Sequence, residues 1–173
     1  NDFAPYAGWL NDHGIDIDHV KVFDHEMTAT CFITTDQSHN QFTGFYPGAM
    51  GHAKELSLEA AANGVEVVIV SPDDPEAMKR HCSAAQRVPA KFIYDPSFQV
   101  IAMDGEFLWE GAKGAYALIL NDYEFSVFLD KTGKTIEELH QEIEVLVVTL
   151  GEKGSRIMAR GESELLVSPA STG

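Results

Sequence analysis

A short polar segment that follows an apolar run offers the first residue pattern capable of phosphate chemistry. Asn121 and Glu124 stand three positions apart, directly after the apolar run 116–120. This spacing is typical of a helix-capping box, in which each side chain bonds a backbone N–H of the other residue. If the run is a parallel strand, the same helix N-terminus favours a phosphate, and the carboxylate can hold Mg²⁺ through water. The pattern alone leaves both interpretations open.

A glycine-containing loop after a second apolar run offers a matching pattern. Residues 149–154 read Thr-Leu-Gly-Glu-Lys-Gly and close the apolar run that begins at 145. Such a loop is either a turn into the next strand or a place where backbone N–H groups approach a nucleotide phosphate, because small residues leave room. Both segments are expected at carboxyl strand ends of one sheet, and this shared edge strengthens the functional interpretation of each.

Several other patterns are explained better by structure than by chemistry. The tripeptide Gly-Lys-Thr at 133–135 resembles the end of a phosphate-binding loop, but Phe128 stands where that motif needs a glycine. We expect a loop that leads into a capped helix instead. The single Glu137–His140 pair is expected on a solvated helix face. No Gly-x-Ser-x-Gly elbow is present, which argues against a serine hydrolase. Surface or structural roles are expected for three evenly spaced histidines: His13, His19 and His25.

The composition excludes several classes of function. The chain has 173 residues, with 12 Lys and Arg against 27 Asp and Glu, so its formal charge is −15. This charge argues against binding nucleic acid or an anionic membrane surface, because both need clustered basic side chains. No apolar run approaches the roughly 20 residues of a membrane span. The two cysteines, Cys31 and Cys82, are too few for a disulfide framework, and we expect both to be small buried side chains of a cytoplasmic protein.

The first part of the chain indicates a helix followed by a small antiparallel sheet. Apolar residues recur at helical spacing over 3–13. Three segments rich in β-branched and aromatic residues follow, at 20–23, 28–35 and 41–46. A polar turn at 36–40 is expected between the last two.

From residue 49 onward, apolar strands alternate with helices. Strands are expected at 65–70, 92–94, 116–120 and 145–150, and a hairpin at 155–160 and 164–167. Helices are expected at 49–62, between 73 and 88, at 105–113, from 122 and from 135. Near-continuous apolar strands predict a largely parallel sheet covered by helices on both faces. The predicted fold class is α/β, with a small β appendage near its start.

With these motifs in place, the chain resembles the ribokinase-like (PfkB) family of ATP-dependent carbohydrate and nucleoside kinases. Asn121 and Glu124 fit the family's N-x-x-E motif, and residues 149–154 fit its T-x-G-x-x-G nucleotide loop. Residues 1–3 and 14–16 are similar to the stretch before the family's lid. Segments 35–41 and 45–50 are most similar to prokaryotic adenosine or nucleoside kinases. The resemblance covers the whole chain, which corresponds to the central portion of the family's domain.

The resemblance implies a ribokinase-like fold in which about 17–46 form a β lid and about 49–173 form the α/β core. It implies ATP and Mg²⁺ as cofactors, with Glu124 at the metal, and a homodimer formed through the lid strands. The nucleotide-binding residues that it implies are Asn121, Thr149, Gly151 and Gly154. Candidate substrate residues in the lid are Asn40, Gln41 and Phe32, whose ring could stack on a purine.

The family's catalytic base has no counterpart among these residues. Family members carry an upstream glycine pair and aspartate that grip the sugar, and a downstream G-A-G-D signature whose aspartate is the base. That signature does not occur in the chain, so the base is expected beyond Gly173 and no catalytic residue is assigned. Asp95 follows a strand, but turn formation is its expected role.

The expected function is therefore ATP-dependent phosphoryl transfer to the hydroxyl of a nucleoside or a sugar, by a chain that itself lacks the base. The alternative is a non-catalytic remnant that binds nucleotide or dimerises.

Overall fold

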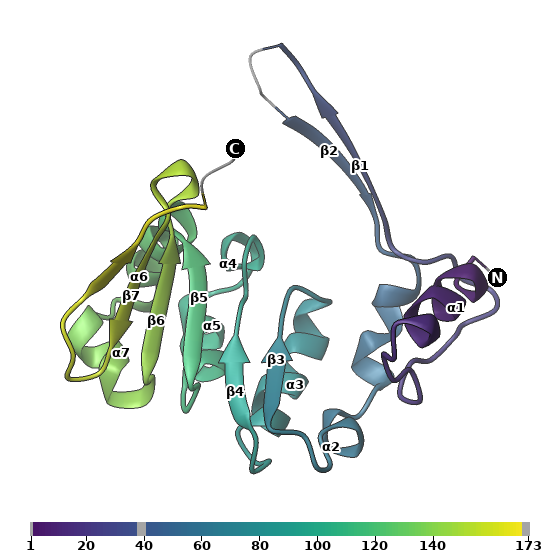
Figure 1. The fold of residues 1–173 in the computed structure, drawn as a ribbon, viewed down its shortest axis with the longest axis horizontal. Helices are drawn as coiled ribbons and strands as arrows, with labels where there is room; N and C mark the ends of the chain where they lie inside the picture. Colours follow the sequence, from purple (N-terminus) through teal and green to yellow (C-terminus); the bar gives the residue numbers. More distant parts are fainter. Residues whose placement is uncertain (1, 38–40, 171–173) are drawn as a thin grey trace. The chain divides into compact units, whose positions relative to one another are not determined.

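The computed structural model describes residues 2–37 and 41–170. The chain divides into two compact units, the first comprising residues 1–56 and the second 57–173 (Figure 1). Within the described ranges, no helix is both long enough and apolar enough to cross a membrane.

The first unit contains a helix and a two-stranded sheet. Helix α1 (Ala4–Asp12) confirms the helix expected at 3–13, and β1 (Thr30–Thr35) pairs antiparallel with β2 (Gln41–Tyr46). The third expected strand, at 20–23, is wrong. This segment makes turn hydrogen bonds instead, from Val20 N to Ile17 O and from Glu26 N to Phe23 O. Because these backbone bonds are local, the segment does not join the sheet.

The prediction of one continuous helix at 49–62 is wrong, because the segment is interrupted. Residues Gly48–Glu55 form a 3-10 helix, η1, and α2 (Leu58–Ala61) begins after a break. Leu56 is extended, with φ −86° and ψ 150°, and the Ser57 hydroxyl accepts a hydrogen bond from Ala60 N. Ser57 therefore caps a new helix, and the two units divide at the same place.

The second unit is built on a six-stranded mixed sheet. Its strands follow the order β3 (Val67–Val70), β4 (Lys91–Tyr94), β5 (Ala117–Asn121), β6 (Val145–Thr149), β7 (Ser155–Ala159) and β8 (Leu165–Val167). The first four run parallel, and β7 and β8 return antiparallel as the expected hairpin. Besides α2, its helices are α3 (Pro75–Ala85), α4 (Gln99–Ala102), α5 (Gly105–Ala112), α6 (Asp122–Thr132) and α7 (Ile136–Glu142). This arrangement confirms the predicted α/β class.

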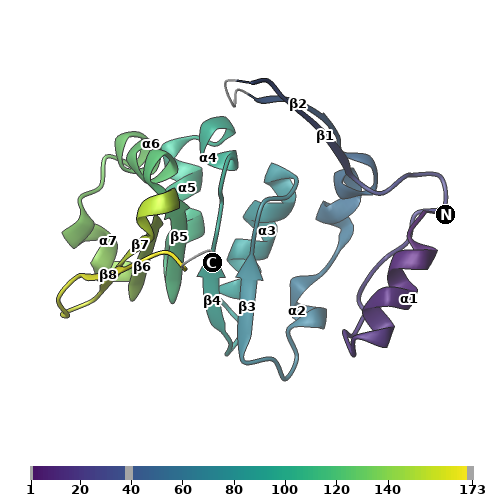
Figure 2. The same ribbon diagram turned by 45° about the horizontal axis from the view of Figure 1, so that its top comes forward.

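The larger helices of the second unit pack on one face of its sheet (Figure 1 and Figure 2). Alternate strand residues, such as Phe92, Leu118 and Leu146, point into this layer and are almost fully buried. They belong to one apolar core with Leu108 of α5 and Phe128 of α6. The core therefore lies between the helices and a single face of the sheet, and it holds the carboxyl strand ends in place.

The opposite face of this sheet is apolar as well. Val67 and Ile69 of β3 are 47% and 62% exposed, and Ile93, Ile119 and Val147 follow on the same face by register. The expectation that helices cover both faces is therefore wrong for the residues that the structure describes. The strands form near-continuous apolar runs because both of their faces are apolar, although helices cover only one.

The two cysteines differ in exposure. Cys82 of α3 is buried, as expected, and this burial raises the pKa of its thiol to about 12. Cys31 is exposed on β1, so the expectation that it is buried is wrong. The reason is that both β1 and β2 expose most of their residues on each face of their two-stranded sheet.

Candidate functional site

The carboxyl ends of the parallel strands bring the two predicted polar segments side by side. Strands β5 and β6 are neighbours, and Asn121 is the register partner of Thr149. Thr149 pairs in turn with Ser155 of β7. Two of the candidate nucleotide-binding residues thus come from adjacent strands at the edge where open α/β sheets bind ligands.

Asn121 and Glu124 form a complete capping box at the start of α6. The Asn121 side-chain oxygen accepts a hydrogen bond from Glu124 N at 2.8 Å, and Glu124 Oε2 accepts one from Asn121 N at 2.8 Å. The structure therefore confirms the predicted capping box. It also holds the Glu124 carboxylate at the sheet edge, because one of its oxygens is tied to the backbone of β5.

Residues of the loop after β4 meet Glu124 from the neighbouring strand. Ser97 Oγ donates a hydrogen bond to Glu124 Oε1 at 3.3 Å. Ser97 itself has a φ of 44°, in the left-handed region that non-glycine residues rarely adopt. Sequence reasoning did not single out Ser97 and gave Asp95 only a role in a turn. The signal that could have found them is the position of Asp95 directly after an apolar strand.

Asp95 and Glu124 offer carboxylate oxygens, the kind of ligand that binds a divalent cation. Both residues are half-buried. Burial raises the pKa of Asp95, and the charge of Glu124 raises it further. In the described part of the chain, neither carboxylate forms an ion pair with a basic side chain. Oxygen ligands with uncompensated negative charge are the ligands that Mg²⁺ prefers.

The loop after β6 has two glycines with different surroundings. Gly154, with φ +88°, passes so close to β8 that an added Cβ would lie 1.9 Å from Val167 O. Gly151, with φ +58°, has nothing within 4 Å of such a Cβ. The N–H groups of Gly151 and Glu152 make no backbone hydrogen bond within the described residues. Gly154 thus has a packing role, whereas Gly151 faces open space beside unpaired N–H donors.

The candidate substrate residues of the first unit are not brought to one face. Phe32 of β1 is 71% exposed and pairs with Gly44. Gln41 of β2 pairs with Thr35, three residues along β1 from Phe32. Since strand side chains alternate between faces, Phe32 and Gln41 point to opposite sides of the two-stranded sheet. Asn40 lies outside the described residues.

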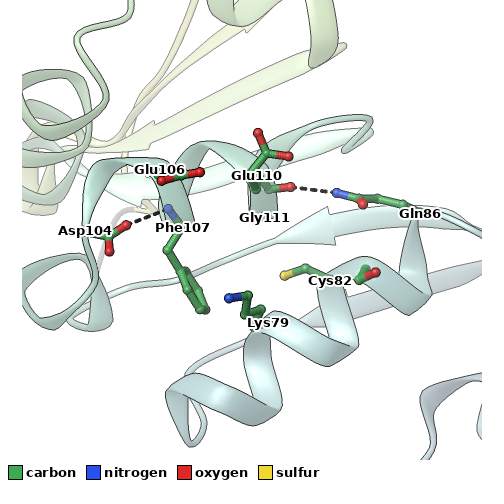
Figure 3. Close-up of a pocket in the computed structure, with 9 residues that line it drawn as sticks. Lys79, Cys82, Gln86, Asp104, Glu106, Phe107, Glu110 and Gly111 are labelled. Atoms are coloured by element: carbon green, nitrogen blue, oxygen red, sulfur yellow. Dashed lines mark hydrogen bonds between the residues drawn. The ribbon is translucent and has the colours of Figure 1, made fainter.

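A cavity of about 410 Å³ lies elsewhere in the second unit, between α3 and α5 (Figure 3). It is lined by Lys79 and Cys82 of α3 and by Phe107 of α5, among others. Gln86 Nε2 donates a hydrogen bond to Glu110 O at 2.8 Å across it. None of the predicted site residues lines this cavity, and the Gln86 hydrogen bond links the end of α3 to α5.

Comparisons with known proteins find similar sequences over nearly the whole chain. A model of the pfkB family of carbohydrate kinases matches residues 2–172. A nucleoside kinase of Methanocaldococcus jannaschii is 28% identical over 155 residues, which cover 90% of this chain and 50% of the relative. The chain therefore spans about half the length of the relatives that it matches.

Solved structures show a similar fold. The nucleoside kinase of Burkholderia thailandensis bound to inosine has a TM-score of 0.88 and 30% identity, over 98% of this chain and 55% of that one. The same enzyme has also been solved in complex with ADP-inosine, with a TM-score of 0.89. The Methanocaldococcus jannaschii enzyme, described as an archaeal member of the ribokinase family, has a TM-score of 0.88 and 25% identity, over 99% of this chain and 56% of that one. These likenesses confirm the ribokinase-like fold.

Proposed function

Because the chain belongs to the pfkB family of carbohydrate kinases, we propose that it forms the nucleotide-binding part of a kinase that transfers the γ-phosphoryl group of ATP to a nucleoside hydroxyl. The observation that carries this proposal is the register pairing of Asn121 with Thr149 at the carboxyl edge of the sheet. The nucleoside kinases to which the chain is similar support the acceptor class, since one of them binds inosine and ADP-inosine.

The proposed roles follow the positions of the residues. Asn121, Thr149, Gly151 and the loop shaped by Gly154 line the nucleotide phosphates, which the α6 N-terminus favours electrostatically. Glu124 and Asp95 would hold Mg²⁺, which would supply neutralisation of charge on the phosphates. Glu124 is suited to this role because Asn121 N and Ser97 Oγ fix its two oxygens.

We further propose that this stretch does not complete the reaction by itself. No Gly-Ala-Gly-Asp sequence, which carries the base in the family that it resembles, occurs in the 173 residues. Phosphoryl transfer needs the acceptor hydroxyl to be oriented and deprotonated as well as the phosphates to be neutralised. The 173-residue chain is therefore proposed to bind nucleotide without sustained turnover.

The lid is proposed to contribute acceptor contacts and a dimer interface. Phe42 pairs with Thr34, which lies two residues from Phe32 on β1, so the two exposed phenylalanine side chains share one face of the β1–β2 sheet. An aromatic face of this kind suits a purine. The unpaired edges of the two strands suit pairing with a second copy.

The test separates a nucleotide-binding role of Asn121 from simple helix capping. Thr135 provides a matched control, because it forms an equivalent capping box with Glu138 at the start of α7, away from the sheet edge. Asn121→Ala and Thr135→Ala should each lower the free energy of unfolding by about 1 kcal/mol. In calorimetric titration with ADP and Mg²⁺, Asn121→Ala should lose affinity by about tenfold or more. Thr135→Ala should bind as the wild type does.

Equal ADP affinity in both variants would show that Asn121 is only a cap. In the same preparation, with the 19.0 kDa mass confirmed, ATP consumption is measured with inosine, adenosine, cytidine, ribose and fructose. ADP binding without turnover is expected. Sustained turnover at that mass would contradict the missing base, and turnover with sugars alone would replace the nucleoside with a sugar as acceptor.

A further inference from the structure

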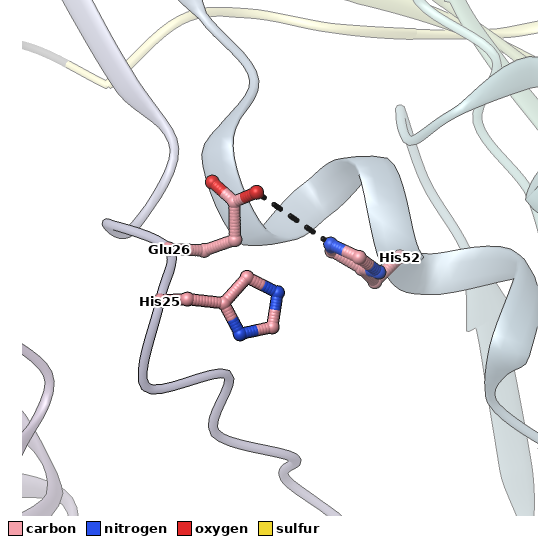
Figure 4. Close-up of side chains that lie close together, drawn as sticks. All are labelled: His25, Glu26 and His52. Carbon is pink, nitrogen blue, oxygen red and sulfur yellow. Dashed lines mark ion pairs between the residues drawn. The ribbon is translucent and has the colours of Figure 1, made fainter.

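Three side chains of the first unit converge at the base of its two-stranded sheet. His25 and Glu26 come from the loop before β1, and His52 comes from η1, which follows β2 (Figure 4). Their potential metal-binding atoms all lie within 4.8 Å of one another. In the described ranges of the chain, no other group of three His, Cys, Asp or Glu side chains is gathered this closely.

His52 is held in an orientation suited to metal binding. Its Nδ1 lies 2.7 Å from Glu55 Oε1, and its Nε2 faces Glu26 Oε1 at 3.7 Å. The Phe23 ring stacks on the imidazole, with centroids 4.3 Å apart and planes 19° apart. A carboxylate on one ring nitrogen is the usual outer partner of a metal-binding histidine, because it fixes the tautomer and turns the other nitrogen toward the metal.

Glu26 is held in a corresponding way. Tyr46 donates a hydrogen bond to Glu26 Oε2 at 3.1 Å, which leaves Oε1 on the side of His52. The 3.7 Å between Glu26 Oε1 and His52 Nε2 is too long for a hydrogen bond. It is close to the spacing of about 3.4 Å between two ligands on a tetrahedral Zn²⁺, given bond lengths near 2.1 Å.

His25 completes the group from the exposed side. Its ring meets that of His52 edge to face, with centroids 5.7 Å apart. Because His25 is exposed, rotation of its side chain can bring a ring nitrogen to the remaining position. Two imidazoles and one carboxylate form a ligand set that suits Zn²⁺.

We propose that His25, Glu26 and His52 bind one Zn²⁺ ion, with water in the fourth position. The ion would join the loop before β1 to the helix after β2, where Ala49 N already donates a hydrogen bond to Met27 O at 2.9 Å. Its effect would be to clamp the base of the two-stranded sheet. This site lies in the first unit and does not depend on the proposed kinase activity.

A simpler state of the same residues provides the rival explanation. The hydrogen bond with Glu55, and then the charges of Glu55 and Glu26, raise the pKa of His52, against an opposing effect of burial. A protonated His52 could therefore satisfy both carboxylates without any metal. The two explanations differ in what they predict when Zn²⁺ is added.

The test is calorimetric titration of the metal-free 173-residue chain with ZnCl₂ at neutral pH. We expect one ion per chain. Affinity should fall by at least about 100-fold in His25→Gln and in His52→Gln, and by about tenfold in Glu55→Gln, which alters only the outer partner. His140→Gln is the matched control, because this histidine lies on α7 in the second unit; it should leave Zn²⁺ affinity unchanged. The weak binding that remains in His52→Gln measures binding by the acidic surface.

Two further measurements keep the result interpretable. Circular dichroism of the metal-free variants checks that they fold, and ADP titration of the same variants should be unaffected by loss of the Zn²⁺ site. Thermal unfolding should show that Zn²⁺ raises the midpoint of the wild type and of His140→Gln, but not that of His52→Gln. Equal Zn²⁺ affinity in the wild type and in His52→Gln, or no binding of one ion per chain, would overturn the site and leave His52 as an ion-pair partner of Glu26 and Glu55.

Discussion

At the scale of single residues, Asp95 makes the turn contact expected of it, a hydrogen bond from Ser97 N to its carboxylate, in surroundings that disfavour its charge. Burial raises its pKa, and the charge of Glu124 adds to the effect. A carboxyl whose pKa is higher in the folded state opposes folding when it is ionised. This cost is full above the folded-state pKa and disappears as the pH falls below the unfolded value near 3.9.

Asp95→Asn should therefore stabilise the protein at pH 7 in the absence of Mg²⁺. We expect the midpoint of thermal unfolding to rise by about 1–3 °C, and the difference from the wild type to shrink as the pH is lowered toward 4. Glu162→Gln is the control, because Glu162 is exposed in the turn between β7 and β8; it should change stability by less than about 0.5 kcal/mol. A destabilised Asp95→Asn at pH 7 would mean that the carboxylate is compensated in the folded protein.

At the scale of elements, the loop between β6 and β7 contains two glycines with different roles. Gly154 packs against β8, whereas Gly151 is proposed to bind the nucleotide. Gly154→Ala would place its Cβ against Val167 O, a backbone atom that cannot move without displacing β8. Gly151→Ala meets only the strain of a positive φ, because no atom lies near its Cβ. Gly151→Ala should thus cost about 1 kcal/mol of stability, and Gly154→Ala about 3 kcal/mol or more.

Urea unfolding measures these two costs, and ADP titration measures binding in the variant that stays folded. We expect Gly151→Ala to weaken ADP binding despite its small effect on stability, because its methyl group occupies the open side of the loop. Equal destabilisation by the two substitutions would contradict the packing role assigned to Gly154.

At the scale of the whole molecule, the apolar second face of the six-stranded sheet is the feature least typical of a folded domain. Ile69 is 62% exposed there, whereas its neighbour Val70 is 4% exposed in the core. Exposed apolar side chains on a sheet face bind hydrophobic dyes and promote association. The 173-residue chain should accordingly enhance the fluorescence of an anilinonaphthalene sulfonate dye in its folded state.

Ile69→Lys should lower that dye fluorescence while changing the free energy of unfolding by no more than about 0.5 kcal/mol. Val70→Ala is the comparison, since it removes buried methyl groups and should cost about 2 kcal/mol. If Ile69→Lys were as destabilising as Val70→Ala, the second face would be packed in solution, and its exposure would not explain the dye binding.

Features with local causes were predictable from the residues alone. The alternation of strands and helices, the capping boxes at Asn121 and Thr135 and the final hairpin follow from periodicity and side-chain-to-backbone bonds within a few positions. The placement of Asn121 and Thr149 at one edge of the sheet was predictable as well, because the carboxyl ends of parallel strands lie at the same edge. The motif residues and the α/β class therefore needed no coordinates.

Features that depend on partners distant in the chain were decided only by the tertiary structure. Glu124 meets Ser97, and His25 and Glu26 converge on His52, although no local pattern in the sequence relates these segments. Nor does a local pattern show that Val67 and Ile69, on the second face of the sheet, are left exposed. Helical and strand periods encode which side of an element is apolar. They do not encode which element will cover that side, because the covering partner is set by packing across the whole chain.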